Sequence, residues 1–313
     1  MEVISRPATE QDADLVKEIA NSHLKFFNSQ EKLLGDSEAL NLIRGFVDSA
    51  ITRLVKSSNS QDWEAFLTLN PDNSRKRSYL DIYTRPGAPT LESSLNLALD
   101  LAKKSVHDHH LWIGVSSEDT QYRKILHNKH FSLLRRYWLL ELDLTDLVMT
   151  QSNYFDQIRE INLDDEMELK SFHEVNQDSF SKHFGFMPRP YEQWRELVLR
   201  DREEVNLRAW LLSSDGLDVG FMDLNDELVH EEAGYVAGLG VRLSHHSRGM
   251  GEALLRKAIQ VSAARGLKKL CLSVDTGNES GALRLYEKVG MKPISEWHQY
   301  ENLNWSELEI HNS

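Results

Sequence analysis

A short apolar segment that runs through a glycine-containing turn into a helical pattern constrains the fold of this 313-residue chain most strongly. The stretch is YVAGLGVRLSHHSRGMGEA, residues 235–253. Its first part, Tyr235 to Val241, is small and apolar and predicts a buried strand. Further on, apolar residues recur at helical spacing and predict one packing face. They are Leu254, Leu255, Ala258, Ile259 and Ser262. The sequence therefore predicts a strand, a tight turn and a helix in succession.

The turn has the properties of an anion site. The first turn of a helix carries unpaired N–H groups and the positive end of the helix dipole. Gly249 and Gly251 let an anion approach the backbone closely, and Arg248 adds positive charge at the rim. A P-loop would end in Gly-Lys-Ser/Thr, but the next lysine is Lys257. A dinucleotide-binding turn would need a third glycine where Leu254 stands. The pattern that remains is R-x-x-G-x-A.

This pattern and a run further along the chain resemble the GNAT superfamily of acyl-CoA-dependent N-acyltransferases. The run is a strand-like segment, Leu270 to Val274, then Asn278, then ALRLYEKVGM at residues 282–291. The resemblance implies that backbone N–H groups of the turn hold the coenzyme A pyrophosphate. It also implies that the strand Ala237 to Val241 pairs with the pantetheine arm, which Gly238 and Gly240 would let approach closely. The residues implied in coenzyme binding are Leu239, Gly240, Val241, Arg248, Gly249, Met250, Gly251, Glu252, Ala253 and Asn278; Asn278 would equally suit a helix cap.

The implied reaction moves an acetyl group from acetyl-CoA, a co-substrate, to a primary amine. An ammonium acceptor must lose a proton, and the departing thiolate must gain one. Tyr286 matches the family position whose phenol serves as general acid, although a core aromatic residue on a helix would fit the same pattern. For the general base we assign Glu232, with Glu231, Asp223 and a water-relayed proton left open.

The order of predicted elements in residues 1–150 repeats in residues 151–313. The offset between matched residues grows slowly, from 153 (159 − 6) to 160 (291 − 131), which is typical of a duplicated fold with small insertions. The matched pairs are Arg6 and Arg159, Thr9 and Asn162, Asp12 and Asp165, Ile82 and Val241, and Phe131 and Met291. We therefore predict an α/β fold of two tandem GNAT-like domains, 1–150 and 151–313, each a mixed central sheet flanked by helices. The boundary is expected at the unpatterned segment Thr150 to Tyr154.

The first domain lacks the residues of the anion turn. An offset of 159 places Pro89, Thr90, Glu92 and Ser94 at the positions of Arg248, Gly249, Gly251 and Ala253. Pro89 has no N–H to offer, and Glu92 would repel a pyrophosphate. Leu126 stands at the position of Tyr286. We predict that the first domain keeps the fold without the acyl-CoA site, an arrangement that resembles the mycothiol synthase family. That family carries a glutamate on the central strand where Tyr235 stands here.

Periodicity predicts the remaining elements of the first half. A strand at residues 3–9 precedes a helix from Glu10, with Thr9 as its N-cap. A helical face follows within residues 28–55, formed by Leu40, Ile43, Phe46, Val47, Ala50 and Leu54. The other predicted elements are a strand at 63–69, a turn at 70–73, a strand at 79–83, a helix at 91–104, a strand at 111–115, a helix at 121–129 and a strand at 133–142.

Composition excludes several classes of function. The net charge of −13 argues against nucleic acid as a partner and mildly favours a cationic acceptor. The sequence contains no run of eighteen apolar residues, so no membrane span is predicted. The first residues carry no secretory signal pattern. The single cysteine, Cys271, lies in a strand-like run and is expected to be a buried apolar residue in a reducing compartment. We expect a cytoplasmic protein, and the sequence does not predict its oligomeric state.

Three groups of side chains allow two interpretations each. His245 and His246 suggest a metal site, but adjacent histidines do not easily point at one ion and no third ligand is spaced suitably, so no metal is predicted. His107, His109 and His110 are treated likewise. An aromatic segment predicts either an acceptor pocket or packing between the two halves; it comprises Phe180, His183, Phe184, Phe186 and Trp194.

Three functions therefore remain open. The first is an N-acetyltransferase whose acceptor is a small amine, an aminosugar, a peptide N-terminus or an antibiotic. The second is a sensor or scaffold that binds acyl-CoA without turnover, for which Tyr235 in place of the glutamate is the main support. The third is a pair of interaction modules whose turn binds another anion.

Overall fold

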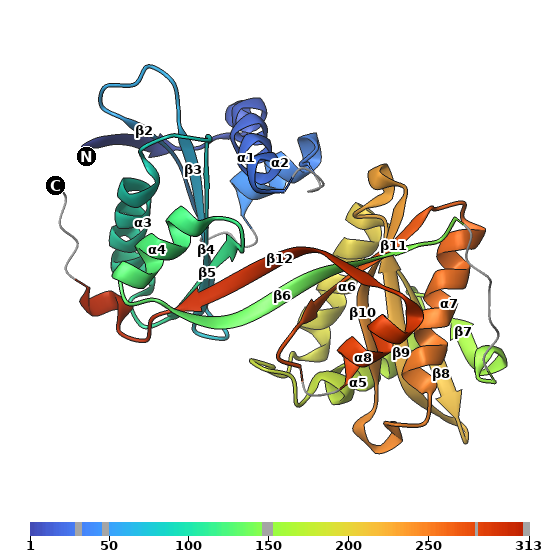
Figure 1. Ribbon diagram of the computed structural model, residues 1–313. Coiled ribbons are helices and arrows are strands. Elements are labelled where there is room, and N and C mark those ends of the chain that lie inside the picture. Colours follow the sequence, from blue (N-terminus) through green and yellow to red (C-terminus); the bar gives the residue numbers. More distant parts are fainter. Residues whose placement is uncertain (29–32, 46–49, 146–152, 279–280, 309–313) are drawn as a thin grey trace. The chain divides into compact units, whose positions relative to one another are not determined.

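The computed structural model describes residues 1–28, 33–45, 50–145, 153–278 and 281–308. The chain divides into two compact units (Figure 1). Unit 1 comprises Met1–Tyr137 and Ser295–Ser313, and unit 2 comprises Trp138–Ile294. The chain leaves unit 1 within one strand, β6 (Ser132–Asp143), and returns to it within another, β12 (Lys292–Glu301).

Unit 1 contains five further strands and four helices in the described residues. The strands are β1 (Val3–Pro7), β2 (Ile51–Ser57), β3 (Ala65–Asp72), β4 (Arg77–Thr84) and β5 (His110–Ser116). The helices are α1 (Ala13–Phe27), α2 (Asp36–Arg44), α3 (Leu91–Val106) and α4 (Thr120–Asn128).

Unit 2 repeats this series of elements. Its strands are β7 (Ile158–Glu160), β8 (Arg208–Ser214), β9 (Leu217–Asn225), β10 (Ala233–Val241) and β11 (Lys269–Asp275). Its helices are α5 (Glu166–Phe180), α6 (Tyr191–Val205), α7 (Met250–Ala264) and α8 (Ala282–Val289). None of the helices within the described ranges is long and apolar enough to cross a membrane.

The strand order is the same in both units. It is β1-β2-β3-β4-β5-β12 in unit 1 and β7-β8-β9-β10-β11-β6 in unit 2. Each sheet is mixed, because β4–β5 and β10–β11 are parallel and the neighbouring pairs antiparallel. The two halves of the chain exchange their last strands. β12 comes from the second half of the chain yet pairs with β5 of unit 1, from Trp297↔Ser116 to Glu301↔Trp112. The predicted duplicated α/β fold is confirmed.

Because of this exchange, the compact units do not follow the predicted domain ranges, 1–150 and 151–313, at the end of the chain. Residues 295–308 pack with unit 1, because the antiparallel ladder between β12 and β5 completes its sheet. Of the predicted boundary, residues 150–152 lie outside the described residues.

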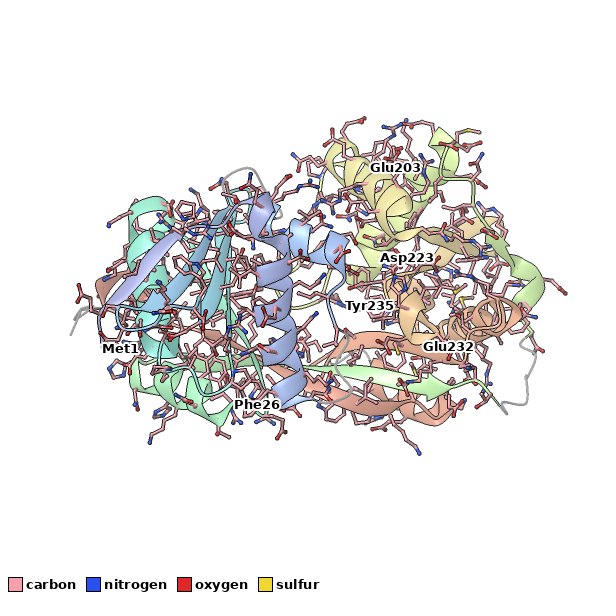
Figure 2. The ribbon with its side chains drawn as sticks, turned by 90° about the horizontal axis from the view of Figure 1, so that it is seen from above. Met1, Phe26, Glu203, Asp223, Glu232 and Tyr235 are labelled. Atoms are coloured by element: carbon pink, nitrogen blue, oxygen red, sulfur yellow. The ribbon has the colours of Figure 1, made fainter. Side chains whose placement is uncertain are left out.

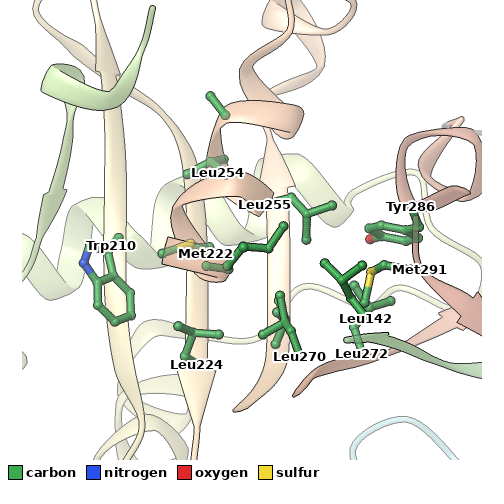
Figure 3. Packing of buried hydrophobic residues seen from close by; sticks show 14 of the residues in the cluster. Leu142, Trp210, Met222, Leu224, Leu254, Leu255, Leu270, Leu272, Tyr286 and Met291 are labelled. Carbon is green, nitrogen blue, oxygen red and sulfur yellow. The ribbon is translucent and has the colours of Figure 1, made fainter. Parts of the chain in front are cut away.

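Helices cover both faces of each sheet. In unit 2, Phe172 of α5 packs on Trp194 of α6 and Phe221 of β9, with ring centroids 4.9 and 5.4 Å apart. On the other face, the predicted apolar stripe of α7 is buried against β9, β10 and β11 (Figure 3). Each fully buried leucine there contributes about 1.5–3 kcal/mol. These two packed faces fix the β10–α7 connection.

Two predictions in the first half are wrong. The helical face at residues 28–55 ends at Arg44, and Ile51–Ser57 is a strand, because its β-branched and alternating side chains pair with both β1 and β3. Phe46 and Val47 lie outside the described residues. The turn predicted at 70–73 is largely strand, since β3 continues to Asp72 opposite Arg77. In addition, Thr9 caps a 3-10 turn, and α1 itself begins at Ala13.

Candidate functional site

The two parallel strands at the centre of unit 2 share only a short ladder. The register runs from Ala233↔Lys269 to Val236↔Leu272, and β10 then continues to Val241 along β9. A β-bulge lies between Val236 and Gly238. The edge of β10 beyond the ladder therefore offers backbone groups of the kind to which an extended ligand adds. The predicted coenzyme residues Leu239, Gly240 and Val241 lie on this edge.

The predicted anion turn forms the start of α7. Gly249 is its N-cap with φ +81°, a left-handed conformation that favours glycine. The amide of Ala253 donates to the Gly249 carbonyl (N···O 3.1 Å) and begins the helical ladder. The amides of Met250, Gly251 and Glu252 come before that bond and are first-turn donors. A Cβ at Gly251 would meet only the Leu285 side chain, at 3.5 Å, so packing within the chain does not demand glycine there.

The charged side chains around this turn leave it net positive. Glu252 accepts hydrogen bonds from Lys288 (2.5 Å) and Arg256 (2.8 Å). The bonds from Lys288 and Arg256 lower the pKa of the Glu252 carboxyl. Arg248 is exposed, with its guanidinium 3.4 Å from the Ser244 carbonyl. With three cations against one carboxylate, the turn keeps net positive charge for an anion.

Gly238 and Gly240 serve packing within unit 2. A Cβ at Gly238 would lie 2.6 Å from Asp223 Oδ1 and 2.9 Å from the Phe221 ring. A Cβ at Gly240 would lie 2.7 Å from both the Phe221 ring and Ser179 Cβ. The sequence predicted glycine here because pantetheine would approach closely. The structure adds a second reason, since side chains of β9 and α5 occupy the space beside both glycines.

Tyr286 lies on α8 within the hydrophobic core. Its ring belongs to the cluster that includes Leu142, Leu255 and Met291 (Figure 3). Burial raises the pKa of the Tyr286 phenol to about 12, so the group is protonated at neutral pH and can donate a proton. Asn278 is not the N-cap of α8, because that position is Gly281.

Glu232 lies at the far end of β10 from the turn. It precedes Ala233 in a left-handed conformation (φ +55°) and pairs with Lys268 at 2.7 Å. At about 3.3 Å per strand residue, Glu232 is separated from Gly240 by roughly 25 Å. Figure 2 shows it apart from Asp223. The structure therefore does not bring the predicted base Glu232 to the site, and Glu231 is its neighbour in the same 3-10 turn.

Asp223 does lie beside the open part of β10. Its register partner is Gly238, the first residue after the bulge. Its Oδ1 is buried and has no hydrogen-bond partner among the described residues. Burial raises the pKa of the Asp223 carboxyl to about 7. The sequence carried a signal for this residue, an acidic side chain within the otherwise apolar strand FMDL.

Part of the aromatic segment packs within unit 2. Phe180 lies 5.7 Å from the Phe221 ring and 4.6 Å from the His183 ring, and Trp194 packs on Phe172. Burial lowers the pKa of His183, which also feels the charges of Asp275 and His246. The segment thus lies on the same face of the sheet as Asp223.

The other histidine and cysteine predictions concern local structure. His246 Nε2 lies 2.9 Å from the Val241 carbonyl oxygen, and His245 Nδ1 lies 2.9 Å from Ser244 Oγ. No group of three His, Cys, Asp or Glu side chains in the described part of the chain is arranged to hold a metal ion. Cys271 is buried as predicted, which raises the pKa of its thiol to about 12.

Residues 169–291 match the family model described as the acetyltransferase (GNAT) family. This segment of unit 2 is therefore similar to GNAT acetyltransferases. The match begins in α5 and ends just after α8, so it contains β10, the turn and Tyr286. No curated protein matches the chain.

Solved structures extend the likeness to both units. A GCN5-related N-acetyltransferase from Sphaerobacter thermophilus matches with a TM-score of 0.78 and 17% identity, over 96% of this chain and 95% of that one. A tandem GNAT protein from the clavulanic acid biosynthesis pathway matches with a TM-score of 0.71 and 14% identity over 100% of both chains. A GCN5-related glucosamine N-acetyltransferase region of a fungal multi-domain GH3 β-N-acetylglucosaminidase matches with a TM-score of 0.70 and 16% identity, over 96% of this chain and 38% of that one. At these identities the likeness shows a shared tandem GNAT fold.

Proposed function

We propose that unit 2 transfers an acetyl group from acetyl-CoA to a primary amine of a small molecule or peptide. The observation that carries the proposal is the pairing of two features in one place. The first-turn amides of α7 follow the left-handed Gly249, and the edge of β10 beyond Val236 lies outside the parallel ladder. The first suits a pyrophosphate and the second suits the amides of a pantetheine arm.

Residues from β10, the turn and the segment before α8 would hold the co-substrate. We assign the pyrophosphate to the amides of residues 249–253, with Arg248 at the rim, and the pantetheine arm to residues 239–241. Asn278 is proposed to contact the coenzyme. Tyr286 is proposed to protonate the leaving thiolate, because a phenol carries its proton at neutral pH and can donate it.

The class of acceptor rests on the net charge and on the relatives. The net charge of −13 favours a cationic amine. One similar fold is named as a glucosamine N-acetyltransferase region, so an aminosugar is a reasonable first acceptor to test. A cysteine-linked aminosugar of the mycothiol type, a peptide N-terminus and an amine antibiotic complete the set. We further propose that the protein acts in the cytoplasm.

The test is release of the CoA thiol from acetyl-CoA in the presence of an amine panel. Cys271 is the single cysteine and is buried, so a thiol reagent reports the released CoA. We expect amine-dependent release by the wild type, loss of release in Gly251→Glu, and activity in Gly251→Ala. Binding of acetyl-CoA without release for any amine would contradict transfer and favour the acyl-CoA sensor.

A further inference from the structure

We propose that Asp223 is the group that accepts the proton from the amine in unit 2, a role that rests on the acetyl transfer proposed above. The three observations behind it are the face of the sheet on which Asp223 lies, the glycine opposite it, and a carboxyl at the equivalent place in unit 1.

Asp223 points to the α5–α6 face of the sheet. Its neighbours Met222 and Leu224 belong to the core beneath α7, whereas Phe221 belongs to the core beneath α5 and α6. Side chains alternate along a strand, so Asp223 shares the face of Phe221. Phe180 reaches Phe221 on this face. The carboxyl therefore lies on the side of the sheet that carries the aromatic segment.

The glycine opposite Asp223 makes room for its carboxyl. A Cβ at Gly238 would lie 2.6 Å from Oδ1, closer than side-chain carbons are found, so only glycine leaves this position to the carboxyl. Gly238 is also the first residue beyond the bulge, next to the part of β10 that leaves the parallel ladder. The carboxyl is thus built into the point where an extended thioester would end and an acceptor would meet it.

Unit 1 has a carboxyl, that of Asp81, at the strand pair that corresponds to Asp223 and Gly238. It is carried by β4, the counterpart of β10, and not by β3, the counterpart of β9. Asn70 pairs with Tyr79 in unit 1, and Asn225 pairs with Tyr235 in unit 2. In unit 1, Thr68 pairs with Asp81, two residues after Tyr79. In unit 2, Asp223 pairs with Gly238, three residues after Tyr235 because of the bulge.

Asp81 also points away from the α3–α4 core, because Leu80 and Ile82 belong to that core. Burial raises the pKa of the Asp81 carboxyl to about 6. Both units therefore hold a buried carboxyl on the same face, and the one in unit 2 belongs to the unit that carries the anion turn.

The surroundings of Asp223 favour proton uptake near neutral pH. In the sheet it lies between Ala209 of β8 and Gly238 of β10, and neither side chain titrates. Burial is the main cause of the raised pKa of the Asp223 carboxyl. The backbone amides of Gly238 and Asp223 donate to the carboxyl and lower its pKa, and the negative charge of Asp201 on α6 raises it. Oδ1 has no hydrogen-bond partner among the described residues, so a lone pair remains for an ammonium donor.

The step balances in protons and bonds. The ammonium gives one proton to the Asp223 carboxylate and becomes a free amine. The amine nitrogen attacks the thioester carbonyl, so a C–N bond forms and the C–S bond breaks. The nitrogen then loses its second proton, and this proton replaces the one that the departing thiolate receives. Asp223 then returns its proton to water.

The experiment compares Asp223→Asn with Asp81→Asn, the matched change in unit 1. For Asp223→Asn we expect unchanged acetyl-CoA affinity and a loss of kcat/KM for the amine of roughly 100-fold or more at pH 7. The wild-type pH profile of kcat/KM should rise and then break near pH 7, the pKa of the free carboxyl, and the variant should lack that break. Asp81→Asn should leave both readouts at the wild-type level.

A second readout does not depend on turnover. Carbon-13 NMR of labelled aspartate carboxyls should show one resonance that titrates near pH 7 and disappears in Asp223→Asn. Titration of that carboxyl below pH 5, or kcat/KM within a few-fold of wild type with the same pH break, would overturn the proposal. If the wild type acetylates no amine, the proposed transfer fails and the role of Asp223 fails with it, whereas equal acetylation by the wild type and Asp223→Asn overturns the role of Asp223 alone.

Discussion

The starts of α3 in unit 1 and α7 in unit 2 show how one fold is kept with and without an anion turn. Thr90 and Gly249 are the two N-caps, and each accepts the amide of the residue four positions on, Ser94 (2.8 Å) or Ala253 (3.1 Å). The backbone differs: φ is −83° at Thr90 and +81° at Gly249. The fold needs only a helix that begins here, so the left-handed glycine is available for another purpose.

The connections before these helices differ in length as well. The paired Asn–Tyr positions place Val241 at Thr84, an offset of 157 (241 − 84), and not at Ile82 as the sequence suggested. The helix starts, Leu91 and Met250, keep the predicted offset of 159 (250 − 91). Unit 2 thus has two more residues between strand and helix. The extra length lies just before the turn that we assign to pyrophosphate.

The largest effect is expected from copying the charge of unit 1 into unit 2. In Gly251→Glu a carboxylate takes the place held by Glu92 in unit 1, and like charge at an anion site costs several kcal/mol. We expect acetyl-CoA affinity to fall by about 100-fold or more. Gly251→Ala should change it by only a few-fold, since its Cβ meets Leu285 at an ordinary 3.5 Å. Competition binding measures both, and equal loss in the two variants would refute the role of charge.

The next effect concerns the two buried carboxyls. Gly238→Ala should destabilise the protein by about 1–3 kcal/mol, because the new Cβ overlaps Asp223 and Phe221. The double variant Gly238→Asp, Asp223→Thr copies the Asp81–Thr68 pair of unit 1. We expect it to be more stable than Gly238→Ala in urea unfolding. A double variant at least as unstable as Gly238→Ala would break the proposed equivalence of the two strands.

A smaller effect is expected at α8. Tyr286→Phe removes the hydroxyl group and keeps the ring in the core. Unit 1 has Leu126 at the matching position. Both Tyr286 and Leu126 accept the amide of the residue five positions on, Met291 and Phe131. We expect kcat to fall about tenfold, or about 1.4 kcal/mol, with acetyl-CoA affinity unchanged. An unchanged kcat would leave Tyr286 as a packing residue.

The smallest effect concerns an ion pair that unit 1 has at its first strand. Arg6 and Asp12 lie 2.6 Å apart, and the hydrogen bond from Arg6 lowers the pKa of the Asp12 carboxyl. A lowered pKa stabilises the fold above about pH 4, the unfolded value, and the contribution is lost as pH falls. Asp12→Asn should therefore cost about 0.5–1 kcal/mol at pH 7 and progressively less toward pH 3.

Asp165, at the matching place of unit 2, instead caps α5 by accepting the amide of Met167 at 2.8 Å. Asp165→Asn keeps a capping side chain and should cost less at pH 7. Thermal unfolding at both pH values checks the pair of variants. An Asp12→Asn cost that does not fall with pH would contradict the ion pair.

Local patterns in the sequence predicted most of the fold because burial imposes them. The stripe of α7 and the offset between matched helices both follow from faces packed on a sheet. The exchange of β6 and β12 left no such pattern, since the spacing of apolar residues marks a strand and does not name the strand with which it pairs. Ile51–Ser57 was predicted as helix because Leu54 continues the helical spacing of Leu40, Ile43 and Ala50, and that spacing does not reveal the pairing with β1 and β3.

The candidate site was predictable where it depends on backbone and less so where it depends on strand pairing. The residue types at Gly249 and Gly251 are enough to predict the turn. The choice between Asp223 and Glu232 required the register, because the bulge before Gly238 decides which carboxyl lies beside the open edge of β10. Neither residue type nor spacing encodes that bulge.

The most direct measurement for the central claim is a calorimetric titration of the whole chain with acetyl-CoA. Of the two matched helix starts, α3 in unit 1 and α7 in unit 2, α7 has the left-handed glycine N-cap and carries Gly251 where α3 carries Glu92. We therefore predict one site per chain, lost in Gly251→Glu and kept in Glu92→Gln. Two sites per chain, or one site that survives in Gly251→Glu, would contradict the assignment of acetyl-CoA to unit 2 alone.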